Sequence, residues 1–286
     1  MLKAFADGRL FGVTAGSGRP SVLALHGWAR TSEDFAATLT GLDAVALDLP
    51  GFGATPPPPE AWGAAAYAEA VAPVLDELAT PVVVLGHSFG GRVAVHLATR
   101  RPEAVAGLVL AGVPLVRPPG AATRRPALAY RMGRAMHRRG LVSEARMQAL
   151  RRRYGSRDYL AATGVMRAVH VKVVNETYED QLAAVACPTE LVWGDDDTAV
   201  PVAVAEAARR LLPRSVLTVV PGAGHLTPLT APDALREAVV RLGGRSGAVH
   251  AGEAGDTGEE AADGADGADG GGRVRPIADG TDGGGR

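Results

Sequence analysis

The feature that most constrains this chain is an apolar run that leads into a serine between glycines. Residues 81–85 read Pro-Val-Val-Val-Leu, residues 86–91 read Gly-His-Ser-Phe-Gly-Gly, and the next seven residues have helical composition. A strand that turns sharply into a helix is the context in which a G-x-S-x-G sequence exposes its serine hydroxyl. The turn leaves no room for a Cβ two positions before and two positions after the serine, so Gly86 and Gly90 are expected as steric requirements. The sequence therefore predicts a strained turn that presents Ser88 above a sheet.

A serine hydroxyl is a poor nucleophile at neutral pH, so it needs a base, and the base needs an orienting group. His225 ends the glycine-rich sequence Pro-Gly-Ala-Gly-His, directly after the apolar run 215–220. An acidic cluster, Asp-Asp-Asp at 195–197, follows another apolar run that ends at Trp193. Serine, aspartate and histidine thus occur in this order, each just past a predicted strand, which is the order used by one large class of serine enzymes.

The sequence resembles the cap-bearing α/β-hydrolase superfamily across roughly residues 10–242. Five motifs carry the resemblance: His-Gly-Trp at 26–28, Asp-Leu-Pro-Gly-Phe-Gly at 48–53, Gly-His-Ser-Phe-Gly-Gly at 86–91, Gly194 with Asp197 and Pro201, and Gly224-His225 with Pro232. Each follows or flanks a predicted strand, as it does in the family. The match departs at Thr230, where many relatives carry an acidic residue five positions after the histidine.

The resemblance implies a catalytic triad. Ser88 would be the nucleophile, His225 the general base and acid, and Asp197 the group that orients the histidine. The oxyanion hole would be formed by the backbone N–H groups of Trp28 and Phe89. No metal and no organic cofactor is implied.

Nearby residues can be assigned other roles. Asp197 is preferred over its two neighbours because the third position after Gly194 places a carboxylate at the tip of the loop. We expect His26 to hold the oxyanion loop by a side-chain hydrogen bond, and Asp48 to accept backbone hydrogen bonds in its turn. His87 occupies the variable position of the serine turn, which usually points away from the substrate. An alternative acid position follows residue 111, but residues 112–114 read Gly-Val-Pro and offer no carboxylate.

The fold class is predicted as α/β, with a mostly parallel central sheet, helices on both faces and a helical cap insertion. Continuous Val/Leu/Ala runs indicate strands that are buried on both faces. We predict strands at 22–26, 44–48, 82–86, 105–111, 189–193 and 215–220, and helices at about 32–41, 62–79, 89–101, 202–212 and 232–242. The content of 47% hydrophobic and 5% aromatic residues suits one such domain with an insertion.

Four segments are predicted along the chain. Residues 1–113 and 183–242 form the two parts of the hydrolase core, residues 114–182 form the helical cap, and residues 243–286 form a disordered tail. The tail contains 15 glycines among 44 residues, nine acidic and four basic side chains, and almost no apolar side chains to bury. Its three Ala-Asp-Gly repeats lack the spacing of calcium-binding arrays, so no calcium site is expected.

The predicted cap is rich in arginine. From residue 117 to residue 157 there are twelve arginines and one acidic residue, Glu144, whereas the whole chain has a net charge of −1. Three interpretations remain open. Arginine can simply be tolerated wherever a solvated cation is allowed, and the chain has 28 arginines against two lysines. The cap can also attract an anionic substrate, an anionic membrane surface or the acidic tail. The third interpretation is nucleic-acid binding, but no recognition motif is present and nucleic acid is not an expected partner.

The later part of the cap, from residue 164 to residue 174, is more apolar. Met166, Val169 and Val173 recur at helical spacing and are candidates to line an acyl or alkyl pocket. The alternative is that this helical face packs on the core.

The N-terminal residues lack the pattern of a secretion signal, and no apolar run reaches the roughly 20 residues of a membrane span. The single cysteine, Cys187, cannot form an internal disulfide and is expected to be a small packed side chain. These features favour a cytoplasmic location. The oligomeric state is left open.

The predicted function is hydrolysis of a carboxylic ester, or a similar acyl bond, through an acyl-enzyme. The substrate would be a small ester, and an anionic one if the arginines attract it. One alternative uses the same triad for C–C bond hydrolysis, perhydrolysis or lyase chemistry. Another is a receptor-like member of the fold that binds a ligand with little turnover.

Overall fold

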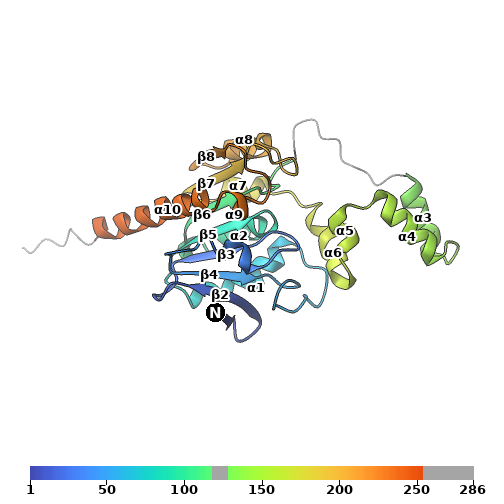
Figure 1. Ribbon diagram of the computed structural model, residues 1–286, viewed down its shortest axis with the longest axis horizontal. Helices are drawn as coiled ribbons and strands as arrows, with labels where there is room; N and C mark the ends of the chain where they lie inside the picture. Colours follow the sequence, from blue (N-terminus) through green and yellow to red (C-terminus); the bar gives the residue numbers. More distant parts are fainter. Residues whose placement is uncertain (118–127, 254–286) are drawn as a thin grey trace, which may run out of the picture.

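A single eight-stranded sheet organises the molecule, in the order β1-β2-β4-β3-β5-β6-β7-β8 (Figure 1). The computed structural model describes residues 1–117 and 128–253. The strands are β1 Leu2–Phe5, β2 Leu10–Ala15, β3 Val22–Leu25, β4 Ala44–Asp48, β5 Val82–His87, β6 Val105–Ala111, β7 Thr189–Gly194 and β8 Ser215–Val220. The pairs β1·β2 and β2·β4 are antiparallel and all others are parallel. The predicted α/β class is confirmed, and all six predicted strands are present.

Successive side chains of the central strands enter two different cores. In β4, Val45 and Leu47 join one buried cluster, whereas Ala44 and Ala46 join the other. Because side chains alternate along a strand, a sheet buried on both faces needs apolar residues at every position. This is why these strands read as continuous apolar runs.

Helices cover both faces of the sheet. The first core includes side chains of α1 (Ala64–Asp76), α2 (Phe89–Arg100), α7 (Glu179–Ala184) and α8 (Val202–Leu211). The second is closed by α10 (Pro232–Glu253) and by residues after the 3-10 turn η1 (Ser32–Phe35). Two short elements complete this part of the chain, η2 (Pro102–Ala104) and α9 (Thr227–Thr230). All parallel strands therefore direct their carboxyl ends toward one edge, where the predicted catalytic residues lie.

The prediction of a helix at 32–41 is wrong. Only the η1 turn forms there, followed by turns whose N–H groups mostly bond to the third residue back. Tertiary contacts determine this outcome. The N–H of Ser32 donates to Asp48 Oδ1 at 2.8 Å, and Asp34 accepts two hydrogen bonds from Arg30 at 2.6 and 2.5 Å. The Ser32 bond ties the first turn to the end of β4, and Gly41, with φ of +78°, ends the segment.

The N-terminal β1–β2 hairpin is not among the predicted strands. Three of the four residues of β1 are exposed, so the segment lacks the apolar pattern of a buried strand. Its turn contains Ala6 and Asp7 at positive φ followed by Gly8. The hairpin extends the sheet antiparallel to β4 and occupies the edge far from the carboxyl ends of β7 and β8.

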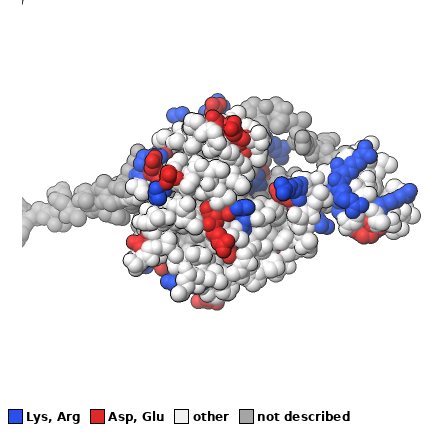
Figure 2. Space-filling model, in the orientation of Figure 1, with Lys and Arg blue, Asp and Glu red and all other residues white. Residues whose placement is uncertain are grey.

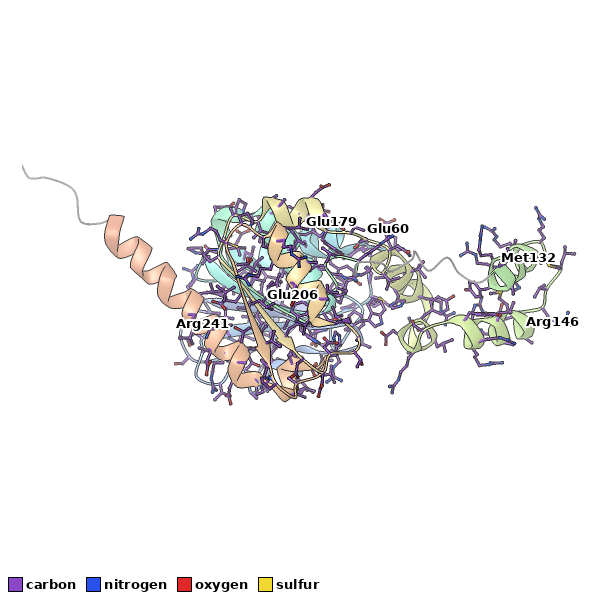
Figure 3. All side chains as sticks on the ribbon, turned by 90° about the horizontal axis from the view of Figure 1, so that it is seen from above. Glu60, Met132, Arg146, Glu179, Glu206 and Arg241 are labelled. Carbon is purple, nitrogen blue, oxygen red and sulfur yellow. The ribbon has the colours of Figure 1, made fainter. Side chains whose placement is uncertain are left out.

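Five helices lie between β6 and β7: α3 Leu128–Arg138, α4 Glu144–Tyr154, α5 Arg157–Ala161, α6 Gly164–Val173 and α7. Gly140 lies between α3 and α4, and Gly155 lies between α4 and α5. Helices α3 and α4 form a hairpin that stands away from the sheet (Figures 1 and 3). Lys and Arg side chains gather on this hairpin (Figure 2).

At the other end of the chain, α10 continues to Glu253, eleven residues beyond the predicted helix end at residue 242. The remainder of the predicted tail, residues 254–286, lies outside the described residues. Across residues 1–117 and 128–253, no helix combines the length and the apolar character needed to span a bilayer.

Candidate active site

Ser88 lies at the junction of β5 and α2 in a strained conformation. Its φ is 49° and its ψ is −110°, a region that residues with side chains rarely adopt. A Cβ added to Gly86 would lie 2.4 Å from the Cα of Gly91, and a Cβ added to Gly90 would lie 2.1 Å from the carbonyl oxygen of Leu25. Both glycines are therefore steric requirements, as the sequence predicted. The turn leaves the Ser88 side chain partly exposed at the carboxyl edge of the sheet.

His225 connects Ser88 with Asp197. Its Nε2 lies 3.2 Å from Ser88 Oγ, and its Nδ1 lies 2.8 Å from Asp197 Oδ2. The loop after β8 supplies the histidine and the loop after β7 supplies the aspartate. In the neutral ring, hydrogen bonding to the carboxylate places the proton on Nδ1 and leaves the Nε2 lone pair facing the serine hydroxyl. The three predicted residues thus lie in the geometry of a nucleophile, a base and an orienting acid.

The Asp197 carboxylate is held by the protein backbone. Its side chain is fully buried, and Oδ1 accepts hydrogen bonds from the N–H groups of Ala199 at 2.9 Å and Val200 at 2.7 Å. Asp195 and Asp196 are exposed, and Asp195 instead accepts a hydrogen bond from the N–H of Gly222 at 2.7 Å. Only the third aspartate of the run therefore faces the histidine.

Gly112 packs against the His225–Asp197 pair, a contact that was not predicted. Its φ is +57°, and a Cβ there would lie 3.1 Å from His225 Nδ1 and 3.2 Å from Asp197 Oδ2. The only signal in the sequence was a glycine directly after β6. A side chain at this position would crowd the hydrogen bond between His225 and Asp197.

The His-Gly-Trp loop is fixed beside the serine by His26. The Nδ1 of His26 donates to the carbonyl oxygen of Gly27 at 2.7 Å, and its Nε2 accepts from the N–H of Leu49 at 2.9 Å. Burial lowers the pKa of His26, which keeps the ring neutral and suits this pair of roles. The expected loop-holding role of His26 is confirmed. Asp48 also accepts two backbone hydrogen bonds, from Ser32 and Ala54, as predicted.

The two predicted oxyanion donors are the N–H groups of Trp28, in the His-Gly-Trp loop, and of Phe89, at the start of α2. The carbonyl oxygen of His26 accepts from the N–H of Gly90 at 3.0 Å, which joins the loop to the start of α2. A Cβ at Gly27 would lie 3.4 Å from Ser88 Cβ, so the loop passes directly beside Ser88. Within the described residues, the N–H groups of Trp28 and Phe89 have no hydrogen-bond partner. Both are available to an oxygen atom bound next to Ser88.

His87 contacts the loop that carries His225. Its Nε2 lies 2.8 Å from the carbonyl oxygen of His225, and the two rings are 5.2 Å apart. Burial, with a smaller contribution from His225, lowers the pKa of His87 to about 4. The neutral ring therefore donates from Nε2, while Nδ1 is buried without a partner among the described residues. The residue at the variable position of the turn thus makes a contact with the loop after β8 that the sequence did not indicate.

Aromatic side chains pack around Trp28 of the His-Gly-Trp loop. The Trp28 ring packs against Phe52 at 5.1 Å, Phe89 at 5.6 Å and His170 of α6 at 4.9 Å between ring centroids. Helix α6 therefore contacts the His-Gly-Trp loop directly. Burial lowers the pKa of His170, so this ring is neutral near pH 7.

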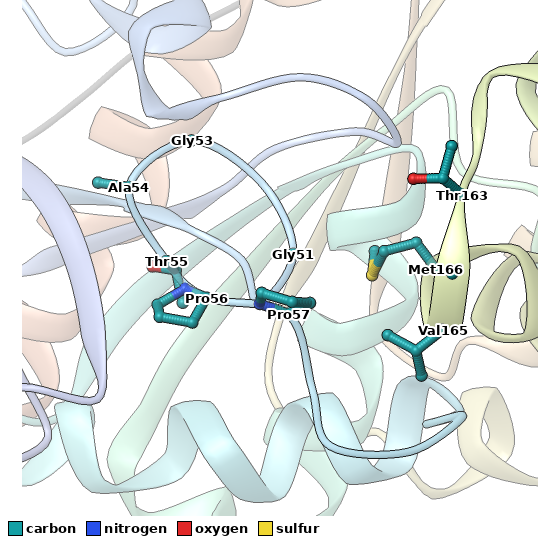
Figure 4. A pocket seen from close by; sticks show the side chains of 10 residues that line it. Gly51, Gly53, Ala54, Thr55, Pro56, Pro57, Thr163, Val165 and Met166 are labelled. Atoms are coloured by element: carbon teal, nitrogen blue, oxygen red, sulfur yellow. The ribbon is translucent and has the colours of Figure 1, made fainter.

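The three predicted pocket residues separate into two groups. Met166 lines a cavity of about 480 Å³ between α6 and the loop at Gly51–Pro57 (Figure 4). Val169 and Val173 are buried in the first core and do not line this cavity. Their side of α6 packs on the protein, because a helix that contacts a core needs an apolar face for that purpose. The cavity is lined neither by Ser88 nor by His225.

Comparisons with known proteins identify the family of the chain. The model of the alpha/beta hydrolase family matches residues 22–238. A pimeloyl-[acyl-carrier protein] methyl ester esterase of Aromatoleum aromaticum is 30% identical over 262 residues, covering 78% of this chain and 99% of that protein. The magnesium-chelatase 30 kDa subunit of Rhodobacter capsulatus is 30% identical over 250 residues, covering 76% of this chain and 84% of that protein.

Solved structures share the fold. A thermophilic esterase from Thermogutta terrifontis superposes with a TM-score of 0.62 at 24% identity, covering 86% of this chain and 98% of that one. The family match covers most of the chain, and its span includes every residue of the candidate site. The chain belongs to the alpha/beta hydrolase family, and it is a hydrolase.

Proposed function

We propose that this hydrolase cleaves carboxylic esters through a Ser88–His225–Asp197 triad. The observation that carries the proposal is the position of the His225 ring, with Nε2 3.2 Å from Ser88 Oγ and Nδ1 2.8 Å from Asp197 Oδ2. This arrangement activates a hydroxyl for attack on an acyl carbon. The 30%-identical relative named as a methyl ester esterase, which matches over 99% of its length, supports an ester as the substrate class.

The mechanism follows from the geometry. Ser88 Oγ attacks the ester carbonyl carbon while His225 Nε2 accepts the hydroxyl proton, and the buried Asp197 carboxylate stabilises the resulting imidazolium. The carbonyl oxygen becomes an oxyanion that accepts hydrogen bonds from the N–H groups of Trp28 and Phe89. His225 then gives its proton to the leaving alcohol and an acyl-enzyme remains. Water attacks the acyl carbon with His225 again as base, which releases the acid and restores Ser88.

In this proposal, the described part of residues 114–182 is a cap whose last helices shape the entrance to Ser88. Support comes from α6, since His170 packs on Trp28 and Met166 packs against Gly51. The acyl or alcohol part of a small substrate would occupy the space between α6 and the Gly51–Pro57 loop, where Met166 lies.

The test compares Ser88→Ala with the unchanged protein on p-nitrophenyl esters of graded acyl length. We expect a fall in kcat of at least roughly 10³-fold for Ser88→Ala, because the nucleophile is lost. A fluorophosphonate probe should label the unchanged protein at Ser88 in a one-to-one ratio and leave Ser88→Ala unlabelled.

Other outcomes identify the rival functions. Hydrolysis by Ser88→Ala at the normal rate would refute the triad mechanism. Labelling at Ser88 without turnover of any ester would favour a ligand-binding protein. Labelling together with turnover of C–C bonded diketones in place of esters would favour the same triad with a different substrate.

A further inference from the structure

One side of α3 carries an exposed apolar stripe. Leu128, Met132 and Met136 recur every four residues and are 67%, 55% and 41% exposed, and Leu141 is 68% exposed. Residues four apart lie on the same side of a helix. The N–H of Leu141 donates to the carbonyl oxygen of Met136 at 2.9 Å across the turn at Gly140, which places Leu141 at the end of the row. We call these four side chains the apolar stripe.

The stripe is separate from the side of α3 that packs on α4. That packing side contains Gly133, where a Cβ would collide with the Leu150 side chain, and His137, which hydrogen-bonds to the carbonyl oxygen of Val142 at 2.8 Å. Tyr130 lies on the same side and shares a hydrogen bond of 2.9 Å with the hydroxyl of Tyr159. The α3–α4 hairpin is thus already packed, and burial of the stripe is not needed to form it.

Arginines occupy the third side of α3. Arg131, Arg134 and Arg138 recur at intervals of three and four, between the stripe and the side that faces α4. Residues 128–154 contain eight arginines and one acidic residue, Glu144, which already pairs with Arg151 and His137. Figure 2 shows basic side chains gathered on the hairpin.

The hairpin is also the part of the described chain that reaches farthest from the sheet on the cap side. Met132 and Arg146 lie at its outer end, remote from the core (Figure 3). Among the described residues, no hydrogen bond or ion pair joins α3 or α4 to the sheet or to the helices packed on it. A flat partner could therefore touch the stripe and the arginines together without meeting the body of the protein.

We propose that the α3–α4 hairpin docks on an anionic lipid surface. A bilayer supplies both chemistries that the hairpin presents, an apolar layer for the stripe and lipid phosphates for the arginines. Helices that lie in the membrane interface combine these features, with Leu and aromatic residues on one side and Lys or Arg on the other. Arg guanidinium groups bind phosphate oxygens in a bidentate manner. Docking here would hold the α6 side of the enzyme, and with it the entrance to Ser88, toward the lipid.

Two other occupants fit less well. A second copy of this chain, paired symmetrically through the stripe, would bring the two sets of arginines against each other, which charge repulsion opposes. The acidic segment 254–286 matches the charge, but its only large apolar residues are Val274 and Ile277, too few to cover four exposed side chains.

The experiment is co-sedimentation of the full chain with phosphatidylcholine vesicles, with and without 30 mol% phosphatidylglycerol. The chain carries Ser88→Ala throughout, so that binding is measured without turnover. We expect binding to the anionic vesicles that weakens from 0.05 to 0.5 M NaCl, and little binding to neutral vesicles. Replacing Arg131, Arg134 and Arg138 by Gln should lower the partition coefficient by roughly 100-fold. Met132→Asp should lower it by at least roughly tenfold.

Matched controls lie elsewhere on the surface. Val240→Asp places the same charge on an exposed apolar residue of α10, and the pair Arg209→Gln, Arg210→Gln removes two exposed cations from α8. Both should leave vesicle binding unchanged, and all variants should retain the circular dichroism spectrum of the parent. With Ser88 restored, Met132→Asp should hydrolyse soluble esters at the parent rate, so docking and the proposed esterase activity are tested separately.

Three results would overturn the proposal. The first is absence of binding to anionic vesicles at low salt. The second is binding that Met132→Asp leaves unchanged, which would reduce the effect to non-specific charge attraction. The third is a concentration-dependent dimer in sedimentation velocity that Met132→Asp abolishes, which would assign the stripe to contact between copies of the chain.

Discussion

The Nε2 of His87 lies 2.8 Å from the main-chain oxygen of His225, so the residue that precedes Ser88 in sequence contacts the loop that carries the proposed base. The contact spans 138 positions of the chain and joins the end of β5 to the loop after β8. Because His87 is buried and neutral, this hydrogen bond limits how far the His225 loop can move away from Ser88.

The first prediction concerns this contact. His87→Leu removes the donor, and we expect kcat for a soluble ester to fall about tenfold, the worth of one hydrogen bond, with KM nearly unchanged. His87→Gln, whose side-chain amide can donate instead, should recover part of the loss. Steady-state kinetics on the three proteins provides the measurement. A loss confined to KM would show that His87 acts on substrate binding and not on the base.

The second prediction concerns the pH dependence of stability. The folded-state pKa of His87 is about 4 and the unfolded value is about 6.5, so below pH 6.5 the unfolded chain binds the proton more readily. Stability should fall as the pH drops from 6.5 toward 4, by up to about 3 kcal/mol from this residue. Burial lowers the pKa of His26 and His170 as well and acts in the same direction.

Urea unfolding at pH 7 and pH 5 tests this. The parent should lose more stability between these values than His87→Leu, which has no ring to protonate. Equal losses in the two proteins would mean that His87 is accessible to protons in the folded state, contrary to its burial.

The third prediction concerns Gly112. Gly112→Ala places a Cβ at φ of +57° next to His225 and Asp197, and should lower kcat at least roughly tenfold by disturbing their hydrogen bond. Gly41→Ala is the matched control, since Gly41 has φ of +78° and nothing within 4 Å of the added Cβ. Both variants should lose about 1–2 kcal/mol of stability from the left-handed backbone. Only Gly112→Ala should lose activity in the ester assay, and loss in both would point to a general effect of backbone strain.

The fourth prediction separates the three aspartates. Asp197→Asn should reduce kcat by on the order of 10⁴, because an amide cannot stabilise the imidazolium and no longer selects the productive tautomer. Asp196→Asn, at an exposed neighbouring position, should retain activity within about twofold. Measured rates of the same size for both variants would contradict the assignment of Asp197.

Much of the fold could be predicted because the central strands are buried on both faces. Val82 to Leu85, for example, needs apolar residues for two cores at once and so reads as an uninterrupted run. The turn at Ser88 was predictable because its close backbone contacts admit only glycine at positions 86 and 90, and both glycines can be read in the sequence.

The remaining features depend on contacts between distant segments. The turn at Ser32 is determined by the Asp48 carboxylate, and the role of His87 by the loop after β8. The core-facing side of α6 has the same spacing as a pocket wall, so Val169 could not be separated from Met166 without knowing what each contacts. The apolar stripe was not predicted, because arginines dominate the composition of the segment.

The two cores of the sheet are complete without α3 and α4. Amino-acid replacements on the outer surface of that hairpin therefore carry almost no penalty for folding of the catalytic domain. Substitutions on this hairpin can therefore change what the protein contacts without disturbing the packing around Ser88.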